Sequence, residues 1–217
     1  TLLSSGVISP YRGRTPFLSR PFIVPKSGLR TRLVIDYSHI TPFLSPPRFY
    51  LPSVYQLVDK PFVLRKDDRI VKFDLQNAFY NVPICPASRF ITAFRHRSKN
   101  YCFNRLPFGL SNSPFHMQML ANIITDFLRP LVSFCWAHID DFVIIASPTV
   151  IKNVVTPFFH ILNDAGLRVN WSKSITEPSK SIPALGATWD IPARKITVNT
   201  DRWAMAGKVF AALTSAQ

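Results

Sequence analysis

Acidic residues are scarce in this sequence. It has 12 Asp and Glu against 26 Lys and Arg, so its 217 residues carry a formal net charge of +14. No acidic residue precedes Asp36 and none occurs between residues 75 and 125, whereas both stretches contain several Arg and Lys among Phe and Tyr. Blocks of one charge sign favour a polyanionic partner, whose phosphates release counterions on binding. A solvated basic face, or a ribosome-like structural protein, would produce the same pattern.

Cysteines and long apolar runs are scarce as well. The three cysteines, Cys85, Cys102 and Cys135, include no CxxC pair, which argues against a disulfide framework and a cysteine-based zinc site. All three lie in apolar segments, so we expect buried free thiols in a reducing compartment. No apolar run approaches the roughly 20 residues that span a bilayer, and the first residues lack the layout of a signal peptide. We therefore expect an intracellular protein, cytoplasmic or nuclear, that is neither secreted nor bound to membranes.

Short apolar runs separated by prolines and glycines predict strands mixed irregularly with helices. This order favours an α+β fold with an antiparallel sheet over a regular βαβ alternation. Strands are expected at residues 22–25 and 33–35, which would form a hairpin, and at 70–75, 91–94, 101–103, 167–171, 184–189 and 195–198.

Helices are expected in four places. The first covers residues 51–60 with Ser53 as its N-cap, and the last begins at Thr200. A third covers about residues 154–165 and ends at Gly166, with Pro157 requiring either a late start or a kink. The remaining helix has Ser113 as its N-cap and Pro114 at its first position. Its apolar stripe comprises Phe115, Leu120, Ile123, Ile124 and Phe127.

Two adjacent carboxylates, Asp140 and Asp141, lie between apolar runs at 134–137 and 142–146. The runs predict two buried strands joined as a hairpin, with the acids at its tip. Adjacent like charges at a sheet edge are unfavourable unless a cation neutralises them, and a hard divalent ion prefers oxygen ligands. An ordinary Asp-containing turn is the alternative at this stage.

A third carboxylate, Asp74, ends the strand predicted at 70–75. If that strand and the hairpin are neighbours in one sheet, the acids converge at one edge. Two divalent ions held about 4 Å apart by carboxylates can activate an attacking oxygen and stabilise a leaving one. In a basic chain this arrangement indicates a polymerase or a nuclease.

Six segments follow one another in the order found in one enzyme family. They are Arg32–Tyr37, Phe73–Ile84, Leu106–Pro114, His138–Asp141, Gly166–Ser174 and Leu185–Gly186. Together they resemble the fingers and palm of reverse transcriptases, over about residues 20–190. The resemblance is nearest to gypsy-type LTR elements and DIRS-type tyrosine-recombinase elements, and more distant to hepadnaviral polymerases. It implies an RNA-directed DNA polymerase of right-hand architecture, with a palm sheet flanked by helices and a truncated thumb.

The resemblance also implies a metal site. Asp74 and Asp140 would bind two Mg²⁺ ions, which Mn²⁺ could replace, and Asp141 and Leu75 would assist. Lys173 would donate a proton to the departing pyrophosphate, although a solvated loop lysine fits that position equally well.

The implied nucleotide site comprises Lys26, Arg32, Gln76, Asn77, Ala78, Phe79 and Phe108. Phe79 would act as a steric gate whose ring leaves no room for a 2′-hydroxyl. Arg32 would offset the triphosphate charge, and Lys26 would be either a second such cation or a solvated side chain. Residues 76–78 would offer backbone N–H groups to the phosphates, and Phe108 would lie beneath the nascent base pair.

Contacts to the template and primer are implied for Gly109, Ser113, Pro114, His138, Ile139, Leu185 and Gly186. Leu185 and Gly186 would form the primer grip. His138 stands where the family usually has Tyr or Phe, and the pattern assigns it no role.

The resemblance divides the chain into parts of one reverse transcriptase domain. Residues 1–69 would be an N-terminal extension and fingers, 70–83 palm, 84–105 fingers, 106–199 palm and 200–217 the start of a thumb. The expected partners are an RNA or DNA template with its primer, deoxynucleoside triphosphates, and thumb, RNase H, integrase or recombinase domains of a longer polyprotein. The competing hypotheses are an inactive polymerase fold that binds nucleic acid or serves as a scaffold, and an RNA-dependent RNA polymerase.

Overall fold

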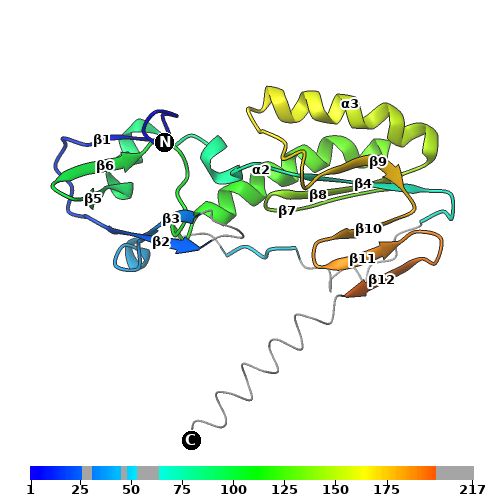
Figure 1. The fold of residues 1–217 in the computed structure, drawn as a ribbon, viewed down its shortest axis with the longest axis horizontal. Coiled ribbons are helices and arrows are strands. Elements are labelled where there is room, and N and C mark those ends of the chain that lie inside the picture. The colour runs from blue at the N-terminus through cyan, green and yellow to red at the C-terminus, as the bar shows by residue number, and fades with distance from the viewer. Residues whose placement is uncertain (26–30, 45–47, 53–63, 199–217) are drawn as a thin grey trace, which may run out of the picture.

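Two lobes lie side by side in the computed structural model, which describes residues 1–25, 31–44, 48–52 and 64–198 (Figure 1). One lobe holds strands β1–β3, β5 and β6, and the other holds β4, β7–β12 and the two long helices. Lys26, the helix predicted at 51–60 and the helix predicted from Thr200 lie outside the described residues, apart from residues 51 and 52.

The larger lobe is built on a four-stranded sheet with the order β7-β8-β4-β9. These strands cover Phe134–His138, Asp141–Ala146, Arg69–Asp74 and Ile175–Ser179, respectively. Every neighbouring pair is antiparallel. The predicted hairpin around the adjacent acids is therefore confirmed, as are the predicted antiparallel sheet and the strand beginning near residue 70.

One face of this sheet is covered by helices α2 (Ser113–Leu128) and α3 (Pro148–Asp164), which lie on the same side of it (Figure 1). Because side chains alternate along a strand, Val71 and Phe73 of β4 point to this face. Phe73 meets Phe158 of α3 edge to face, with 4.8 Å between the ring centroids. Buried aliphatic and aromatic residues from both helices complete this core.

The other face of the sheet is covered by a three-stranded sheet with the order β10-β11-β12. Its strands are Ser181–Ala184, Ala187–Asp190 and Lys195–Val198. Ile70 and Val143, from alternate positions of β4 and β8, pack here with Ile182 and Trp189. The same alternation puts Lys72, Asp74 and Asp141 on this face, beyond its apolar part.

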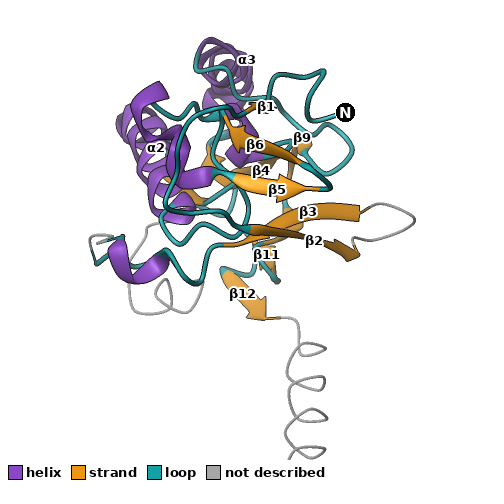
Figure 2. Cartoon of the chain, turned by 90° about the vertical axis from the view of Figure 1, so that its left-hand side faces the viewer, coloured by secondary structure: helices purple, strands orange, loops and turns teal. Residues whose placement is uncertain are grey.

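The smaller lobe contains a sheet with the order β1-β6-β5 and a separate hairpin, β2-β3. Strands β1 to β3 cover Ile8–Pro10, Arg20–Pro25 and Thr31–Asp36, and strands β5 and β6 cover Phe94–His96 and Lys99–Phe103. The predicted β2-β3 hairpin is confirmed. Seen from the end of this lobe, β5 and β6 lie above β2 and β3 (Figure 2). Buried residues such as Ile35, Tyr37 and Phe103 form a core of its own.

Three predicted strands are wrong in extent. Residues 91–92 belong to a 3-10 helix, Pro86–Thr92, which begins at a proline, and the strand starts only at Phe94. Residues 167–171 contribute a single bridge, Val169 to Leu75, because the chain then turns around Asn170. The strand predicted at 184–189 is two strands, separated by a turn in which Leu185 and Gly186 have φ values of 57° and 77°.

The helix predictions also need correction. The N-cap of α2 is Asn112, because the Ser113 hydroxyl donates instead to the carbonyl of Pro107 at 2.9 Å. Ile123 and Phe127, predicted to be buried, are 52% and 67% exposed. The buried stripe instead comprises Met117, Gln118, Ala121, Ile124, Thr125 and Leu128. Helix α3 begins at Pro148, so a late start after Pro157 is wrong and that proline lies inside the helix.

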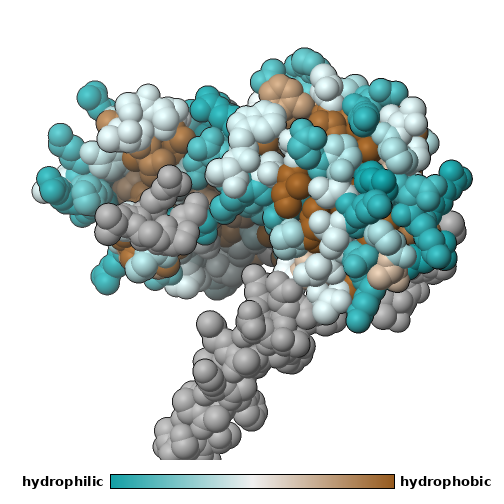
Figure 3. Space-filling view, turned by 45° about the vertical axis from the view of Figure 1, so that its right-hand side comes forward, coloured by the Kyte–Doolittle hydropathy of each residue, from teal (hydrophilic) through white to brown (hydrophobic). Residues whose placement is uncertain are grey.

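The free cysteines differ in exposure. Cys102 and Cys135 are buried as predicted, but Cys85 is exposed because it lies outside the core, just before the Pro86–Thr92 helix. Apolar side chains on the face in Figure 3 form separate patches between polar ones. Within the described ranges, no helix has both the length and the apolar character that crossing a bilayer requires.

Candidate metal and nucleotide site

The turn between β7 and β8 brings Asp140 beside the end of β4. Ile139 adopts a left-handed conformation with φ of 55°, and the Leu75 N–H donates to the Asp140 carbonyl at 2.8 Å. In the sheet register, Asp74 lies directly opposite Asp141. The structure thus brings Asp74 together with the two adjacent acids that follow it 66 and 67 residues later in the sequence.

Asp74 and Asp140 carry charge in unfavourable surroundings. Burial raises the pKa of Asp74 most, and Asp141 raises it further, while Lys173, Asn170 and Lys72 oppose the shift. The pKa of Asp140 is raised first by burial and then by the negative charges of Asp141 and Asp74. These carboxylates repel one another in a partly desolvated place, which is the electrostatic condition that a bound cation relieves.

Asp141 has a cationic neighbour of its own. The Lys72 ammonium lies 3.1 Å from its Oδ1, although this oxygen makes no aligned hydrogen bond. Among the residues that the structure describes, no group of three or more His, Cys, Asp and Glu side chains is gathered tightly enough to hold a metal ion. Asp141 pairs with Lys72 and is not among the residues that line the adjoining pocket. Asp74 and Asp140 both line that pocket, and carboxylate oxygens are the ligands that a hard divalent cation prefers.

A pocket of about 820 Å³ opens beside these two carboxylates. Its walls include most of the residues that the sequence assigns to metal and nucleotide binding: Arg32, Asp74, Leu75, Gln76, Asn77, Ala78, Phe79, Phe108, Ile139, Asp140 and Lys173. Thr31, Asn170 and Ser172 complete the lining. The pocket thus joins the start of β3 in the smaller lobe to the acidic edge of the larger one.

Aromatic side chains form another part of the pocket wall, which includes Phe79 and Phe108. Phe79 meets Phe108 edge to face, with 4.9 Å between the ring centroids, and Tyr80 meets the same ring at 5.2 Å. The Arg32 guanidinium carbon lies 4.3 Å from the centre of the Phe108 ring, as a cation–π contact. The same pocket therefore holds aromatic rings and a positive charge as well as the carboxylates.

Gly109 allows the loop before α2 to lie against β3. Its φ is 101°, and a Cβ atom at this position would come within 2.2 Å of the Ile35 carbonyl oxygen. The Ile35 N–H donates to the Phe108 carbonyl at 3.3 Å. Only glycine accommodates both this conformation and this approach, so Gly109 fixes where Phe108 lies.

Comparisons with known proteins decide the family. The model of the family described as reverse transcriptase (RNA-dependent DNA polymerase) matches residues 24–189. The chain belongs to the reverse transcriptase family. This confirms the resemblance inferred from the six segments.

Two curated relatives support this assignment. The Retrovirus-related Pol polyprotein from transposon 297 of Drosophila melanogaster is 32% identical over 179 residues, which cover 79% of this chain and 16% of the relative. Protein P of Duck hepatitis B virus (strain China) is 27% identical over 208 residues, which cover 88% of this chain and 25% of that protein. The reverse transcriptase chain thus spans a quarter or less of the length of these relatives.

The fold is that of a solved reverse transcriptase. The foamy viral protease-reverse transcriptase, determined in complex with double-stranded DNA, superimposes with a TM-score of 0.74 at 25% identity, over 90% of this chain and 33% of that one. The predicted α+β, right-hand fingers–palm architecture is confirmed. We call the smaller lobe the fingers lobe and the larger one the palm, after the division expected from the sequence, and that division stays a prediction.

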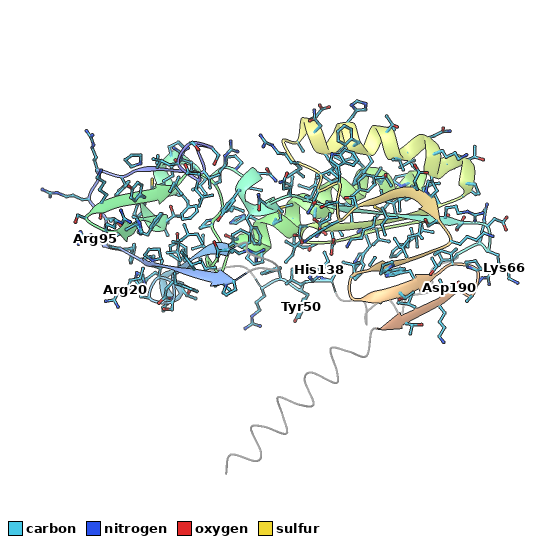
Figure 4. The ribbon with its side chains drawn as sticks, viewed as in Figure 1. Arg20, Tyr50, Lys66, Arg95, His138 and Asp190 are labelled. Carbon is cyan, nitrogen blue, oxygen red and sulfur yellow. The ribbon has the colours of Figure 1, made fainter. Side chains whose placement is uncertain are left out.

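His138 links the palm of this reverse transcriptase to the segment that carries Tyr50. Its Nδ1 atom lies 2.6 Å from the Pro52 carbonyl oxygen, so that nitrogen carries the proton and donates. Figure 4 shows His138 at the lower side of the palm, next to this segment. His138 also lies opposite Asp141 in the sheet register.

The remaining predicted template and primer residues lie around the pocket or apart from it. Ile139 is in its wall, whereas Leu185 and Gly186 form the β10–β11 turn and are not among its lining residues. Ser113 and Pro114 begin α2, and the buried Ser113 holds the preceding loop through its bond to Pro107. The roles of these residues stay predictions.

Sequence reasoning missed two polar residues that support the acids. Gln118 is 3% exposed, its Oε1 accepts from the Ile139 N–H at 2.8 Å, and its Nε2 donates to the Ala137 carbonyl at 3.1 Å. It therefore holds the turn that carries Asp140. The signal available in the sequence was a glutamine three residues before Ala121 and seven before Thr125, on one face of the helix. Asn170, the second missed residue, contacts Asp74.

Proposed function

We propose that this chain is the catalytic core of an RNA-directed DNA polymerase that extends a primer 3′-hydroxyl with deoxynucleoside triphosphates. The observation that carries the proposal is the convergence of Asp74 and Asp140, both with raised pKa values, on a pocket that also contains Arg32 and Phe79. Membership of the family supports it further.

Asp74 and Asp140 would hold Mg²⁺, with Mn²⁺ as a substitute, and the Leu75 carbonyl and Asp141 would assist. Bound divalent ions would activate the primer oxygen and stabilise the leaving pyrophosphate. Asp141 would first have to part from Lys72, whose ammonium lies 3.1 Å away. In this proposal Lys72 balances the charge of Asp141 whenever it is not a ligand.

The nucleotide would lie between the carboxylates and the aromatic wall. Arg32, held over Phe108 at 4.3 Å, would place its positive charge against the triphosphate. Phe79, held against the same ring, would exclude a 2′-hydroxyl because its edge-to-face contact leaves it little freedom to move aside. Lys173, which lines the pocket, would protonate the pyrophosphate as it leaves.

The template and primer would be bound mainly through backbone phosphates, which suits a chain with a net charge of +14. The foamy viral neighbour was determined in complex with double-stranded DNA, which supports binding of a duplex by this chain. Gly109, Ser113, Pro114, His138, Ile139, Leu185 and Gly186 would contact it.

The wider context is also proposed. The named parts would follow the division into fingers, palm and thumb given from the sequence. The curated relatives are longer than this chain and one is named a Pol polyprotein, which supports additional thumb, RNase H, integrase or recombinase domains. Free thiols support an intracellular location, cytoplasmic or nuclear.

Primer extension on an RNA template tests the proposal. The parent protein should incorporate deoxynucleotides in preference to ribonucleotides and only when Mg²⁺ is present. Asp140→Asn should abolish extension, by at least about a thousandfold, while duplex binding measured by fluorescence anisotropy stays within about twofold, because only a metal ligand is lost. Asp67→Asn, at an exposed residue before β4, is the matched control.

The outcomes separate the competing functions. Duplex binding without extension under any metal condition would indicate an inactive, nucleic-acid-binding module. Preference for ribonucleotides would indicate an RNA polymerase and would contradict the gate role of Phe79. Normal extension by Asp140→Asn would refute the assignment of this site.

A further inference from the structure

Asn170 makes two hydrogen bonds to Asp74, the first carboxylate of the site. Its side-chain Nδ2 donates to Asp74 Oδ1 at 2.8 Å, and its backbone N–H donates to the Asp74 carbonyl at 2.7 Å. These two residues are 96 positions apart in the chain. Asn170 also lines the pocket, so it acts at the site itself and not behind it.

The segment after Asn170 also binds the backbone N–H of Asp74. The Asp74 N–H donates to the Ser174 hydroxyl at 3.0 Å, and that hydroxyl donates to the Asn170 carbonyl at 2.9 Å. Both backbone groups of Asp74 and one of its carboxylate oxygens are therefore bound by residues 170–174. The position of Asp74 depends on this short turn as much as on β4.

Ser172 determines which way the Asn170 amide faces. Its hydroxyl donates to Asn170 Oδ1 at 2.8 Å, and an acceptor at that end of the amide leaves the NH₂ end directed at Asp74. The reverse orientation would set the amide oxygen against a carboxylate oxygen and the NH₂ group against the Ser172 hydroxyl. The bond to Asp74 is thus fixed in direction by a neighbour.

A carboxylate held through one oxygen has the other left for a ligand. With Oδ1 of Asp74 bound to Asn170, Oδ2 remains for a cation in the pocket shared with Asp140. Polar groups that orient metal ligands typically change metal affinity or activity by about 10–100-fold when removed. Without Asn170, the Asp74 carboxylate would be free to rotate, and binding a cation would have to restrict it.

We propose that Asn170 is a positioning residue that orients Asp74 so that its second oxygen faces the cation site. The inference rests on the proposed function for its role in polymerisation, but the orientation of Asp74 can be tested by metal binding alone. Ser172 contributes indirectly, because it orients the Asn170 amide.

The test is Mn²⁺ binding to the metal-free protein, followed by electron paramagnetic resonance without nucleotide or duplex. Asn170→Ala should weaken Mn²⁺ binding by about tenfold or more, and Ser172→Ala by a smaller factor because it only loosens the amide. Asn163→Ala, at an exposed position near the end of α3, should bind as the parent does. Circular dichroism and thermal melting check that each variant is folded.

Primer extension gives the second measurement. Asn170→Ala should lower kcat with little change in the KM for the nucleotide, and raising the Mg²⁺ concentration should recover part of the loss. A role confined to folding would instead lower the melting temperature, and the protein that remains folded would need the same Mg²⁺ concentration for primer extension as the parent does. If Asn170→Ala does not fold, Ser172→Ala, whose side chain is exposed, decides the matter through the same Mn²⁺ titration.

The possible failures are distinct. Parent-like Mn²⁺ affinity in Asn170→Ala, or in Ser172→Ala when that variant decides, would overturn the positioning role. A parent protein that binds no Mn²⁺ would overturn it as well. A parent that binds Mn²⁺ in an Asn170-dependent way but extends no primer would refute the polymerase proposal and leave the positioning role intact.

Discussion

At the scale of single residues, the pocket depends on a glycine with a backbone that other residues rarely adopt. Gly109 combines a φ of 101° with the approach to Ile35 that leaves a Cβ atom no room. The consequence reaches Phe108, whose ring supports both Arg32 and Phe79. A change at Gly109 therefore affects stability and the aromatic wall together.

A strained backbone residue usually costs about 1–3 kcal/mol. We expect Gly109→Ala to destabilise the protein by more than this, because its Cβ would also clash with the Ile35 carbonyl oxygen. Chemical denaturation followed by circular dichroism measures this. Gly166→Ala is the control: its φ is 71°, but nothing lies within 4 Å of an added Cβ, so only the conformational cost applies. Equal losses in the two variants would contradict the clash.

Residues differ in how far the sequence could reveal them. Asp74 and Asp140 could be proposed from their residue types and their places at strand ends, whereas Phe79 was proposed only through the family resemblance, and the roles of all three stay predictions. Asn170 and Gln118 could not be found this way, since each acts on a residue that only the folded chain brings near. Polar residues that support a site carry no pattern of their own.

At the scale of elements, the β4–β8 pair places carboxylates where they destabilise the metal-free fold. An acid whose pKa is raised in the folded state binds protons there that the unfolded chain releases. Its stability contribution is therefore lost as the pH rises through the raised pKa, and at neutral pH the charged form is a cost. Asp140, with burial and two neighbouring acids acting on it, is such a group.

Asp140→Asn should accordingly stabilise the protein at pH 7 in EDTA, by about 0.5–2 kcal/mol, the range usual for single stabilising changes. The gain should shrink as the pH falls towards the ordinary carboxyl value of 3.8. Thermal melting over a pH series measures both effects. A variant less stable than the parent at neutral pH would show that the charge is compensated in the folded protein.

Element boundaries were the weakest part of the sequence predictions, for physical reasons. The strand predicted at 184–189 contains Leu185 in a left-handed conformation, which a leucine rarely adopts and which its residue type therefore does not predict. The stripe predicted along α2 mixed residues from two faces, because its large apolar residues are spread around the helix. The β7–β8 hairpin was predicted correctly, since two apolar runs, the second rich in Val and Ile, flank a polar tip.

At the scale of the whole molecule, positive charge is spread over surfaces well away from the pocket. Arg20 and Arg95, for example, lie on the fingers lobe (Figure 4). A chain that neutralises even about three phosphates loses more than tenfold in affinity between about 50 and 200 mM salt.

Duplex binding by this chain should show at least that salt dependence, with little preference for base sequence, in an anisotropy titration over several salt concentrations. Asp140→Asn should give the same slope as the parent, because the acid does not contact phosphate unless a cation bridges them. Affinity that is insensitive to salt would contradict binding through the backbone.

The pairing of β4 with β8 also bears on how this sequence can change over evolutionary time. Asp74 and Asp141 face each other through strands whose side chains alternate, so inserting or deleting one residue in either strand would turn its acid to the opposite face. Because both faces of the sheet are covered, substitutions within β8 must keep consecutive positions apolar from Phe142 to Ala146. Side chains in these strands can therefore be exchanged for other apolar ones, whereas a change in strand length would separate the acids.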